Sequence, residues 1–354
     1  MDVRVLIRQE VLGQQAYPVE AGPVRIKLDA QENPLAIPPE LREELAARFA
    51  RVALNRYPEA GSPALAARFA AALGVRADQV MLGNGSDELI QILCIALARP
   101  GASVVIPSPS FAMYRISALN AGLTVTTVPL AADFDLDLCA LREGMAARPP
   151  ALTFLAYPNN PTGNCFSAGR IEAVLQEASG IVVVDEAYFP FSEKTFLPLM
   201  GRYENLVILR TLSKVGFAAL RIGLLVGQAA LLHELDKVRL PYNLNALSQA
   251  AAGFYLDREA AFLEQAALIR RWRAELFGAL AGLPGVHPRP TDANFIFFSC
   301  DFEADRVYRD LLQRGILIRN LSAPGVKGGF MRVTVGTPEE NREFIETLQD
   351  ILSK

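Results

Sequence analysis

Short apolar runs alternate with longer amphipathic stretches between about residues 65 and 226, and glycine or proline bounds most of these runs. This alternation is typical of strands joined by crossover helices. Several runs are nearly continuous Val, Ile and Leu, as expected for strands covered on both faces of a mostly parallel sheet. The predicted strands are 80–82, 103–106, 124–128, 152–156, 181–184, 206–209 and 223–226.

The pattern changes after the last of these strands. A long helical stretch is predicted over 246–283, and a Gly-Leu-Pro-Gly sequence ends it. Further strands are predicted at 295–298, 316–318 and 331–335. Thr337 then begins a capping box with proline at the first helical position, which predicts a final helix. A helix is also predicted from Ser86 to about residue 98, after the first strand.

A chain of 354 residues is too long for one compact core and suits a large domain with a smaller one. We expect an N-terminal arm and joining segment over 1–34, a large domain over 35–245 and a small C-terminal domain over 246–354. The predicted fold class is α/β, with helices on both faces of the large, mostly parallel sheet and an α+β arrangement in the smaller domain.

The charge balance indicates a small partner rather than a nucleic acid or a membrane. Lys and Arg total 35 against 38 Asp and Glu, so the chain has no basic excess. Charged residues interrupt the first fifteen positions, where a signal peptide would need an apolar core. The longest apolar runs also fall short of the roughly 20 residues that span a bilayer. We therefore expect a soluble, cytoplasmic protein.

Cysteine and histidine are too few and too scattered for a metal site. The four cysteines lie far apart, and neither His233 nor His287 has a Cys, Asp or Glu at metal-ligand spacing. We expect reduced thiols, no bound metal and no Ser-His-Asp triad.

The residues that follow the predicted strands are polar and aromatic, and in an open parallel sheet the ligand lies beyond these strand ends. Asp185 follows four aliphatic residues, and Lys214 follows another strand after Arg-Thr-Leu-Ser. Buried charges of this kind need partners, because desolvation otherwise neutralises them. One ligand would supply both partners: pyridoxal phosphate, which has a cationic ring, an aldehyde and a phosphate.

On this hypothesis the phosphate would bind at the start of a helix, whose free amides and dipole favour anions. The candidate residues are Ser86, Asp87, Thr211, Ser213 and Arg221. Taken alone, the Gly-Asn-Gly-Ser-Asp turn that contains the first two could equally cap an ordinary loop.

The ring would be held by residues from other strand ends. Asp185 would pair with the ring nitrogen, Phe111 would stack on the ring, and Lys214 would form a Schiff base with the aldehyde. Asn160 and Tyr188 would hydrogen-bond the ring hydroxyl. Taken singly, Phe111 could be a core residue and Lys214 a solvated surface lysine.

Several motifs together resemble the histidinol-phosphate aminotransferases of fold type I. They are NNPTG at 159–163, VVVDEAYFPF at 182–191, LRTLSK at 209–214, RYP at 56–58 and MRVTVGTPEEN at 331–341. The resemblance extends over nearly the whole chain, and it is more specific for the fold and cofactor than for the substrate.

The resemblance implies a homodimer in which Tyr57 reaches the cofactor phosphate of the neighbouring subunit. It also implies that Tyr17, Arg319 and Arg332 bind the substrate's phosphate and that Arg332 holds the carboxylate of glutamate or 2-oxoglutarate. Gln31 lies in a further substrate-binding segment. Arginine suits both anions because its planar fork makes paired, charge-assisted hydrogen bonds. The implied reaction is ping-pong transamination between histidinol phosphate and 2-oxoglutarate, in histidine biosynthesis.

Two departures from the family pattern concern this site. The segment from Lys214 to Arg221 is one residue shorter than is usual, and Asp29 and Gln31 stand where asparagines are typical. The first implies a different loop before Arg221, and the second leaves the substrate contacts of residues 27–34 open.

Four alternatives remain at this point. A threonine-phosphate decarboxylase or an aromatic amino-acid aminotransferase would share the fold and cofactor. A dinucleotide-binding module would use the glycine-rich turn, but it lacks a G-x-G-x-x-G string and leaves Lys214 unexplained. A non-catalytic regulator would need a DNA-binding segment, for which no part of the chain remains.

Overall fold

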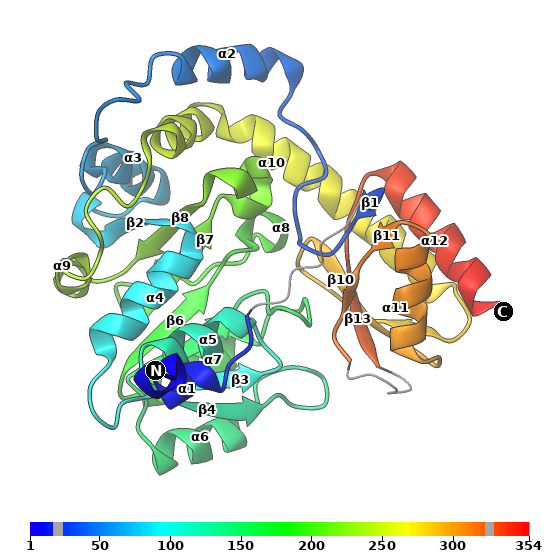
Figure 1. Cartoon of the computed structure of the whole chain (residues 1–354), viewed down its shortest axis with the longest axis horizontal. Coiled ribbons are helices and arrows are strands. Elements are labelled where there is room, and N and C mark those ends of the chain that lie inside the picture. The colour runs from blue at the N-terminus through cyan, green and yellow to red at the C-terminus, as the bar shows by residue number, and fades with distance from the viewer. Residues whose placement is uncertain (17–23, 323–328, 354) are drawn as a thin grey trace.

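The computed structural model describes residues 1–16, 24–322 and 329–353. Within this part of the chain the largest sheet has seven strands in the order β2-β8-β7-β6-β5-β3-β4 (Figure 1). All neighbours are parallel except β8, which is antiparallel to β2 and to β7. The strands are β2 (Val80–Asn84), β3 (Ser103–Ser108), β4 (Thr124–Pro129), β5 (Leu152–Ala156), β6 (Ile181–Asp185), β7 (Leu206–Thr211) and β8 (Ile222–Val226). The predicted α/β class and mostly parallel sheet are confirmed.

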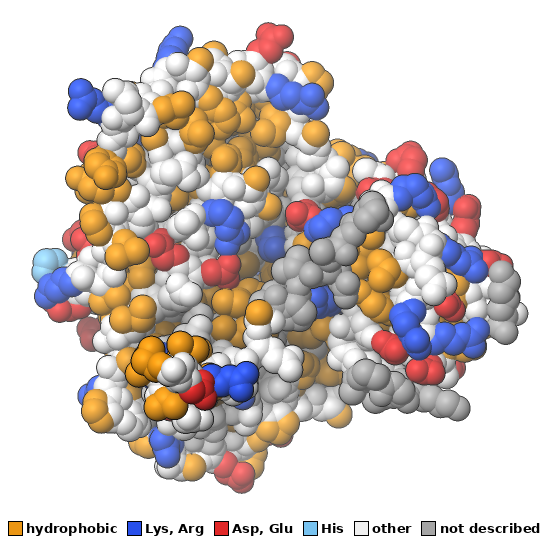
Figure 2. All heavy atoms as spheres, viewed as in Figure 1, with side chains coloured by type: hydrophobic (Ala, Val, Ile, Leu, Met, Phe, Trp, Pro, Cys, Tyr) orange, Lys and Arg blue, Asp and Glu red, His pale blue; other side chains and the backbone are white. Residues whose placement is uncertain are grey.

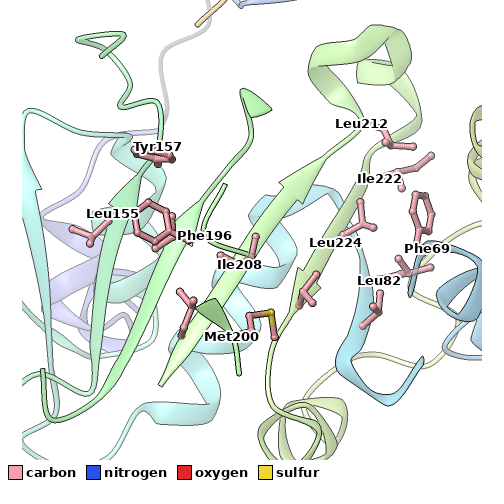
Figure 3. Packing of buried hydrophobic residues seen from close by; sticks show 14 of the residues in the cluster. Phe69, Leu82, Leu155, Tyr157, Phe196, Met200, Ile208, Leu212, Ile222 and Leu224 are labelled. Atoms are coloured by element: carbon pink, nitrogen blue, oxygen red, sulfur yellow. The ribbon is translucent and has the colours of Figure 1, made fainter. Parts of the chain in front are cut away.

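Helices cover both faces of this sheet. Successive residues of each inner strand point to opposite sides, so each strand contributes to a hydrophobic cluster on either face. On β6, Val182 and Val184 pack in one hydrophobic cluster and Val183 packs in another. The first cluster, part of which Figure 3 shows, lies under α3 (Pro63–Leu73), α6 (Leu138–Ala147) and α7 (Ala168–Glu177). The second lies under α4 (Gly85–Leu97), α5 (Ala112–Asn120) and α9 (Ala229–Asp236).

The C-terminal part is a smaller α+β unit, seen at the right of Figure 1. Its four-stranded sheet has the order β12-β13-β10-β9, and every neighbouring pair is antiparallel. Its elements are β9 (Val286–Pro288), β10 (Phe295–Cys300), α11 (Ala304–Gln313), β11 (Ile316–Leu317), β12 (Arg319–Asn320), β13 (Phe330–Thr334) and α12 (Pro338–Leu352). The capping box predicted at Thr337 is confirmed at the start of α12.

One predicted strand is wrong in its extent. Instead of one strand at 316–318, the segment 316–320 contains two short strands: β11 pairs with β1 (Ile26–Lys27), and β12 pairs with β13. The chain changes partner at the buried Ile318, so the strands on either side of this residue belong to different sheets. The pairing of β1 with β11 also places an N-terminal segment on the C-terminal unit.

The long helix α10 (Ala246–Ala281) contributes to both units. Phe254 and Phe262 belong to the core of the large sheet, whereas Ile269 and Leu280 belong to the core of the smaller unit. The division of the chain at 34/35 and 245/246 stays a prediction. The other helices are α1 (Gln9–Leu12), α2 (Pro39–Phe49) and α8 (Phe189–Ser192). Among the described helices, none combines the length and apolar character that crossing a membrane requires.

Candidate active site

A pocket lies at the carboxyl ends of the parallel strands, in the hollow between the two units (Figure 2). It brings together eleven of the residues predicted from the sequence with four others. The lining residues are Gln31, Ser86, Asp87, Phe111, Tyr114, Ala156, Pro158, Asn160, Asp185, Ala187, Tyr188, Thr211, Ser213, Lys214 and Arg221. Segments far apart in the chain meet here because strand ends of a parallel sheet share one edge.

Lys214 follows β7 in a short turn, and its amino group faces the pocket. The Nζ atom donates a hydrogen bond to the carbonyl of Ala30 over 3.2 Å and lies 5.8 Å from the centre of the Tyr188 ring. Burial and the nearby positive charge of Arg332 lower the pKa of Lys214 to about 8. A substantial fraction of the amine is therefore neutral near physiological pH, which is the form that attacks a carbonyl.

Asp185 ends β6 and is 4% exposed. Its carboxylate accepts hydrogen bonds from the Tyr114 hydroxyl at 2.7 Å and from the Ala187 amide at 3.0 Å. Burial raises the pKa of Asp185 to about 6, although both hydrogen bonds act in the opposite direction. The pocket therefore contains a buried carboxylate that a cationic partner would keep charged.

A chain of hydrogen bonds connects the two units across the pocket. The Asn160 amide donates to the Tyr188 hydroxyl over 3.1 Å, and this hydroxyl donates to the Gln31 side chain over 3.4 Å. Arg332 donates to the Asn160 side-chain oxygen and, over 2.8 Å, to the Asp29 carbonyl. Arg332 is 8% exposed, so this network fixes a buried guanidinium beside the pocket.

An anion cradle lies at the N-terminus of α4. Thr211 donates to the Ser213 hydroxyl over 2.9 Å, and Arg221 donates to the same hydroxyl over 3.3 Å. Arg221 also donates to Asp87 over 2.7 Å. The shorter segment after Lys214 folds into two successive short helical turns, and Arg221 follows the second of them at the edge of the site.

Close backbone approach shapes the same cradle. A Cβ atom built on Gly223 of β8 would lie 2.4 Å from the carbonyl carbon of Gly85 and 2.5 Å from the amide nitrogen of Ser86. Glycine at 223 therefore allows the strand to touch the first turn of α4.

The predicted residues Tyr57 and Arg319 do not line the pocket. Tyr57 is 81% exposed and stacks on Tyr242, with ring centres 4.6 Å apart. Arg319 is half-buried and pairs in register with Arg332 across β12 and β13. Tyr17 lies outside the described residues. The roles assigned to these residues, and to the residues that line the pocket, stay predictions.

Tyr114 is a pocket residue that the sequence analysis missed. It is completely buried on α5, three positions after Phe111. Phe111 directly precedes this helix and Tyr114 lies in its first turn, so the nearness of a second aromatic residue to Phe111 is the signal that could have indicated Tyr114.

No group of three or more histidine, cysteine or acidic side chains in the described chain is placed to hold a metal ion.

The Aminotransferase class I and II family model matches residues 23–348. The chain belongs to this family. Curated relatives include histidinol-phosphate aminotransferase 2 of Nitrosococcus oceani, 46% identical over 97% of this chain and 96% of the relative, and histidinol-phosphate aminotransferase of Chromobacterium violaceum, 45% identical over 99% and 98%.

Solved structures of similar fold include two at low identity. Histidinol-phosphate aminotransferase from Sinorhizobium meliloti, in complex with pyridoxal 5'-phosphate, has a TM-score of 0.85 at 22% identity and covers 98% of this chain and 97% of its own. L-threonine-O-3-phosphate decarboxylase from Porphyromonas gingivalis has a TM-score of 0.80 at 23% identity and covers 93% and 100%. These aminotransferase-fold structures agree with the fold class predicted from the sequence.

Class I and II aminotransferases depend on pyridoxal phosphate, and the pocket fits this cofactor. A buried carboxylate, Asp185, lies in the same pocket as an amine of lowered pKa, Lys214. The anion cradle of Ser213, Arg221 and the α4 N-terminus suits the phosphate. Membership of this family excludes the dinucleotide-binding alternative, and Ser86 and Asp87 of the glycine-rich turn line the same pocket as Lys214.

Proposed function

We propose that this aminotransferase transfers an amino group between L-histidinol phosphate and 2-oxoglutarate, giving imidazole acetol phosphate and glutamate in histidine biosynthesis. The near-full-length relatives of 45–46% identity support the reaction, since both have the name histidinol-phosphate aminotransferase. The structural observation that carries the substrate assignment is the facing pair Arg319 and Arg332, of which Arg332 bonds to the pocket residue Asn160.

The arginine pair suits a phosphorylated substrate. Arg319 and Arg332 are directly opposite each other on neighbouring antiparallel strands, so their side chains leave the same face of the sheet. Like charges in this arrangement repel, and a bound dianion between them offsets that cost. The link from Arg332 to Asn160 connects this anion site to the cofactor pocket.

The bound cofactor supplies an electron sink for the carbon that loses its proton. The residues of this chain do the remaining work. Lys214 Nζ would take the proton from the substrate Cα and return it to the cofactor carbon that bore the aldehyde, two atoms away, because its lowered pKa leaves it partly neutral. Asp185 holds its negative charge for the ring nitrogen, and Tyr188 and Asn160 orient the ring hydroxyl.

Arg332 then serves both half-reactions. It contributes to binding of the phosphate when histidinol phosphate is present and of a carboxylate when glutamate or 2-oxoglutarate is present. Its buried position excludes competing water from either contact.

The protein acts as a cytoplasmic homodimer on this proposal. Leu54, Tyr57 and Leu240 are 70–81% exposed, an arrangement that suits burial against a second copy. Tyr57 would then contribute to the phosphate site of the partner, as the family resemblance implies.

A second candidate function is decarboxylation of a phosphorylated amino acid. The L-threonine-O-3-phosphate decarboxylase of Porphyromonas gingivalis has a similar fold. The arginine pair is compatible with this candidate, since a phosphate-binding site does not by itself select histidinol phosphate. A third candidate, an aromatic amino-acid aminotransferase, would need only Arg332, to bind the carboxylate of its substrates.

A substrate panel on the purified protein tests these functions. We expect amino transfer from histidinol phosphate to 2-oxoglutarate, with kcat/KM well above that for phenylalanine or tyrosine. Release of carbon dioxide from threonine phosphate without amino transfer would reject the proposal in favour of the decarboxylase. A kcat/KM that is higher with aromatic amino acids than with histidinol phosphate would favour the aromatic amino-acid aminotransferase.

A further inference from the structure

Tyr114 lines the cofactor pocket and contacts two other residues that line it, Asp185 and Phe111. The hydroxyl donates to Asp185 Oδ2 over 2.7 Å, and both partners are buried. The Phe111 and Tyr114 rings make an edge-to-face contact, with centres 5.5 Å apart and an interplanar angle of 86°. The opposite contact is a parallel stack on Phe154 of β5, with centres 4.6 Å apart.

These contacts fix the Tyr114 ring in position. Phe154 is completely buried within the sheet, so the stack anchors Tyr114 to a rigid strand rather than to a loop. Because the ring cannot rotate away, the hydroxyl stays within hydrogen-bond distance of the Asp185 carboxylate. A charge-assisted hydrogen bond in a buried site is among the strong ones in proteins.

We infer that Tyr114 is a positioning residue for the cofactor: its hydroxyl holds the Asp185 carboxylate for the ring nitrogen, and its ring packs against Phe111. This inference rests on the proposed cofactor site. It assigns the Tyr114 hydroxyl a role through Asp185, whereas the family motifs that led to Asp185 and Lys214 do not include position 114.

The surroundings of Asp185 explain why a donor is needed. Burial and the negative charges of Asp87 and Glu186 all favour protonation of this carboxyl group. The Tyr114 hydroxyl and the Ala187 amide oppose them by binding the ionised form. Tyr114 itself stays protonated as a donor, because burial and Asp185 hold its pKa well above the usual value.

Tyr114→Phe tests the hydroxyl, since phenylalanine keeps both ring contacts. Apoprotein titrated with pyridoxal phosphate should show a dissociation constant about tenfold higher than that of the wild type, as expected for loss of one charge-assisted hydrogen bond. Loss of that bond also raises the pKa of Asp185, so the acid limb of the kcat/KM profile should move to higher pH. The first readout needs no catalytic turnover.

Tyr203→Phe is the matched control. Tyr203 is a buried tyrosine whose hydroxyl donates to Glu172 over 3.1 Å, near the start of β7 and away from the strand ends that form the pocket. We expect this variant to retain the wild-type dissociation constant and pH profile. Changes of equal size in both variants would mean that loss of any buried hydroxyl has the effect, which would overturn the inference.

Tyr114→Leu separates the hydroxyl from the ring. If Tyr114→Phe behaves as the wild type while Tyr114→Leu binds cofactor weakly, packing alone matters and the positioning role is wrong. If wild-type protein binds no pyridoxal phosphate, the proposed function fails before Tyr114 is tested, so the two failures are distinguishable.

Discussion

At the scale of single residues, the lowered pKa of Lys214 has a measurable consequence. A lysine with a pKa of about 8 gains its neutral form as the pH rises through that value. The rate at which apoprotein captures pyridoxal phosphate should therefore increase with pH and level off above about pH 9. Stopped-flow absorbance measures this rate. A midpoint near pH 10.5, the ordinary pKa of lysine, would contradict the lowered pKa of Lys214.

Covalent trapping tests the identity of the reactive lysine. Borohydride should attach the bound cofactor to one peptide, the one that contains Lys214, and Lys214→Ala should abolish the label. Lys237→Ala is the control, because Lys237 is exposed at the end of α9 and pairs with Glu234. Labelling of another lysine in the wild type would disprove the assignment.

Asp185→Asn keeps the shape of the side chain and removes its charge. Cofactor should still bind, while kcat should fall by about 100-fold or more because the ring nitrogen is no longer held protonated. Cofactor content, measured by absorbance, shows whether the site is intact. A near-normal kcat with full cofactor content would remove this role from Asp185.

At the scale of secondary-structure elements, the crossing of β8 and α4 should control phosphate binding. A Cβ on residue 223 would meet the backbone of Gly85 and Ser86, so Gly223→Ala must displace the first turn of α4. We expect pyridoxal phosphate to bind at least tenfold more weakly, and pyridoxal, which lacks the phosphate, to be affected less. Gly201→Ala is the control, because no atom lies within 4 Å of a Cβ there. Equal weakening of both ligands would mean general damage to the pocket.

The pairing of β12 with β13 leads to a test of substrate recognition. Arg319→Ala should slow the half-reaction with histidinol phosphate by about 10- to 100-fold and affect glutamate less, since a charge-assisted contact to phosphate is lost. Arg332→Ala should impair both half-reactions. Stopped-flow absorbance measures each half separately.

The control for these variants is Arg306→Ala. Arg306 is half exposed on α11 and pairs with Asp310 at the surface. Equal, small losses in both half-reactions of Arg319→Ala would remove the phosphate-specific role and favour the aromatic aminotransferase.

The elements themselves could be read from the sequence to different extents. The bounds of β5 (Leu152–Ala156) were predicted as they stand, and those of the other strands in the large sheet to within two residues, because buried strands are rich in apolar residues. The antiparallel direction of β8 and the split of 316–320 between two sheets could not be predicted. Strand direction and partner depend on hydrogen bonds to distant segments, which an apolar run does not specify.

At the scale of the whole molecule, the proposed dimer makes Tyr57 informative. Tyr57 does not line the pocket in the described chain, so a direct contact between Tyr57 and a bound cofactor requires the pocket of a second subunit. Tyr57→Ala should weaken cofactor binding, and the purified protein should have twice the 38.5 kDa mass of one chain in light scattering. A monomer, or unchanged cofactor affinity in Tyr57→Ala, would contradict the shared site.

The sequence by itself determined the family, the cofactor and most of the pocket. Lys214, Asp185 and Asn160 each follow a strand that their own segment makes recognisable, so local pattern and strand-end chemistry were sufficient. Tertiary structure alone decided which atoms meet. The bond from Tyr114 to Asp185 and the link from Arg332 to Asn160 join segments 71 and 172 residues apart. Such contacts follow from the packing of layers, and no local pattern encodes that distance.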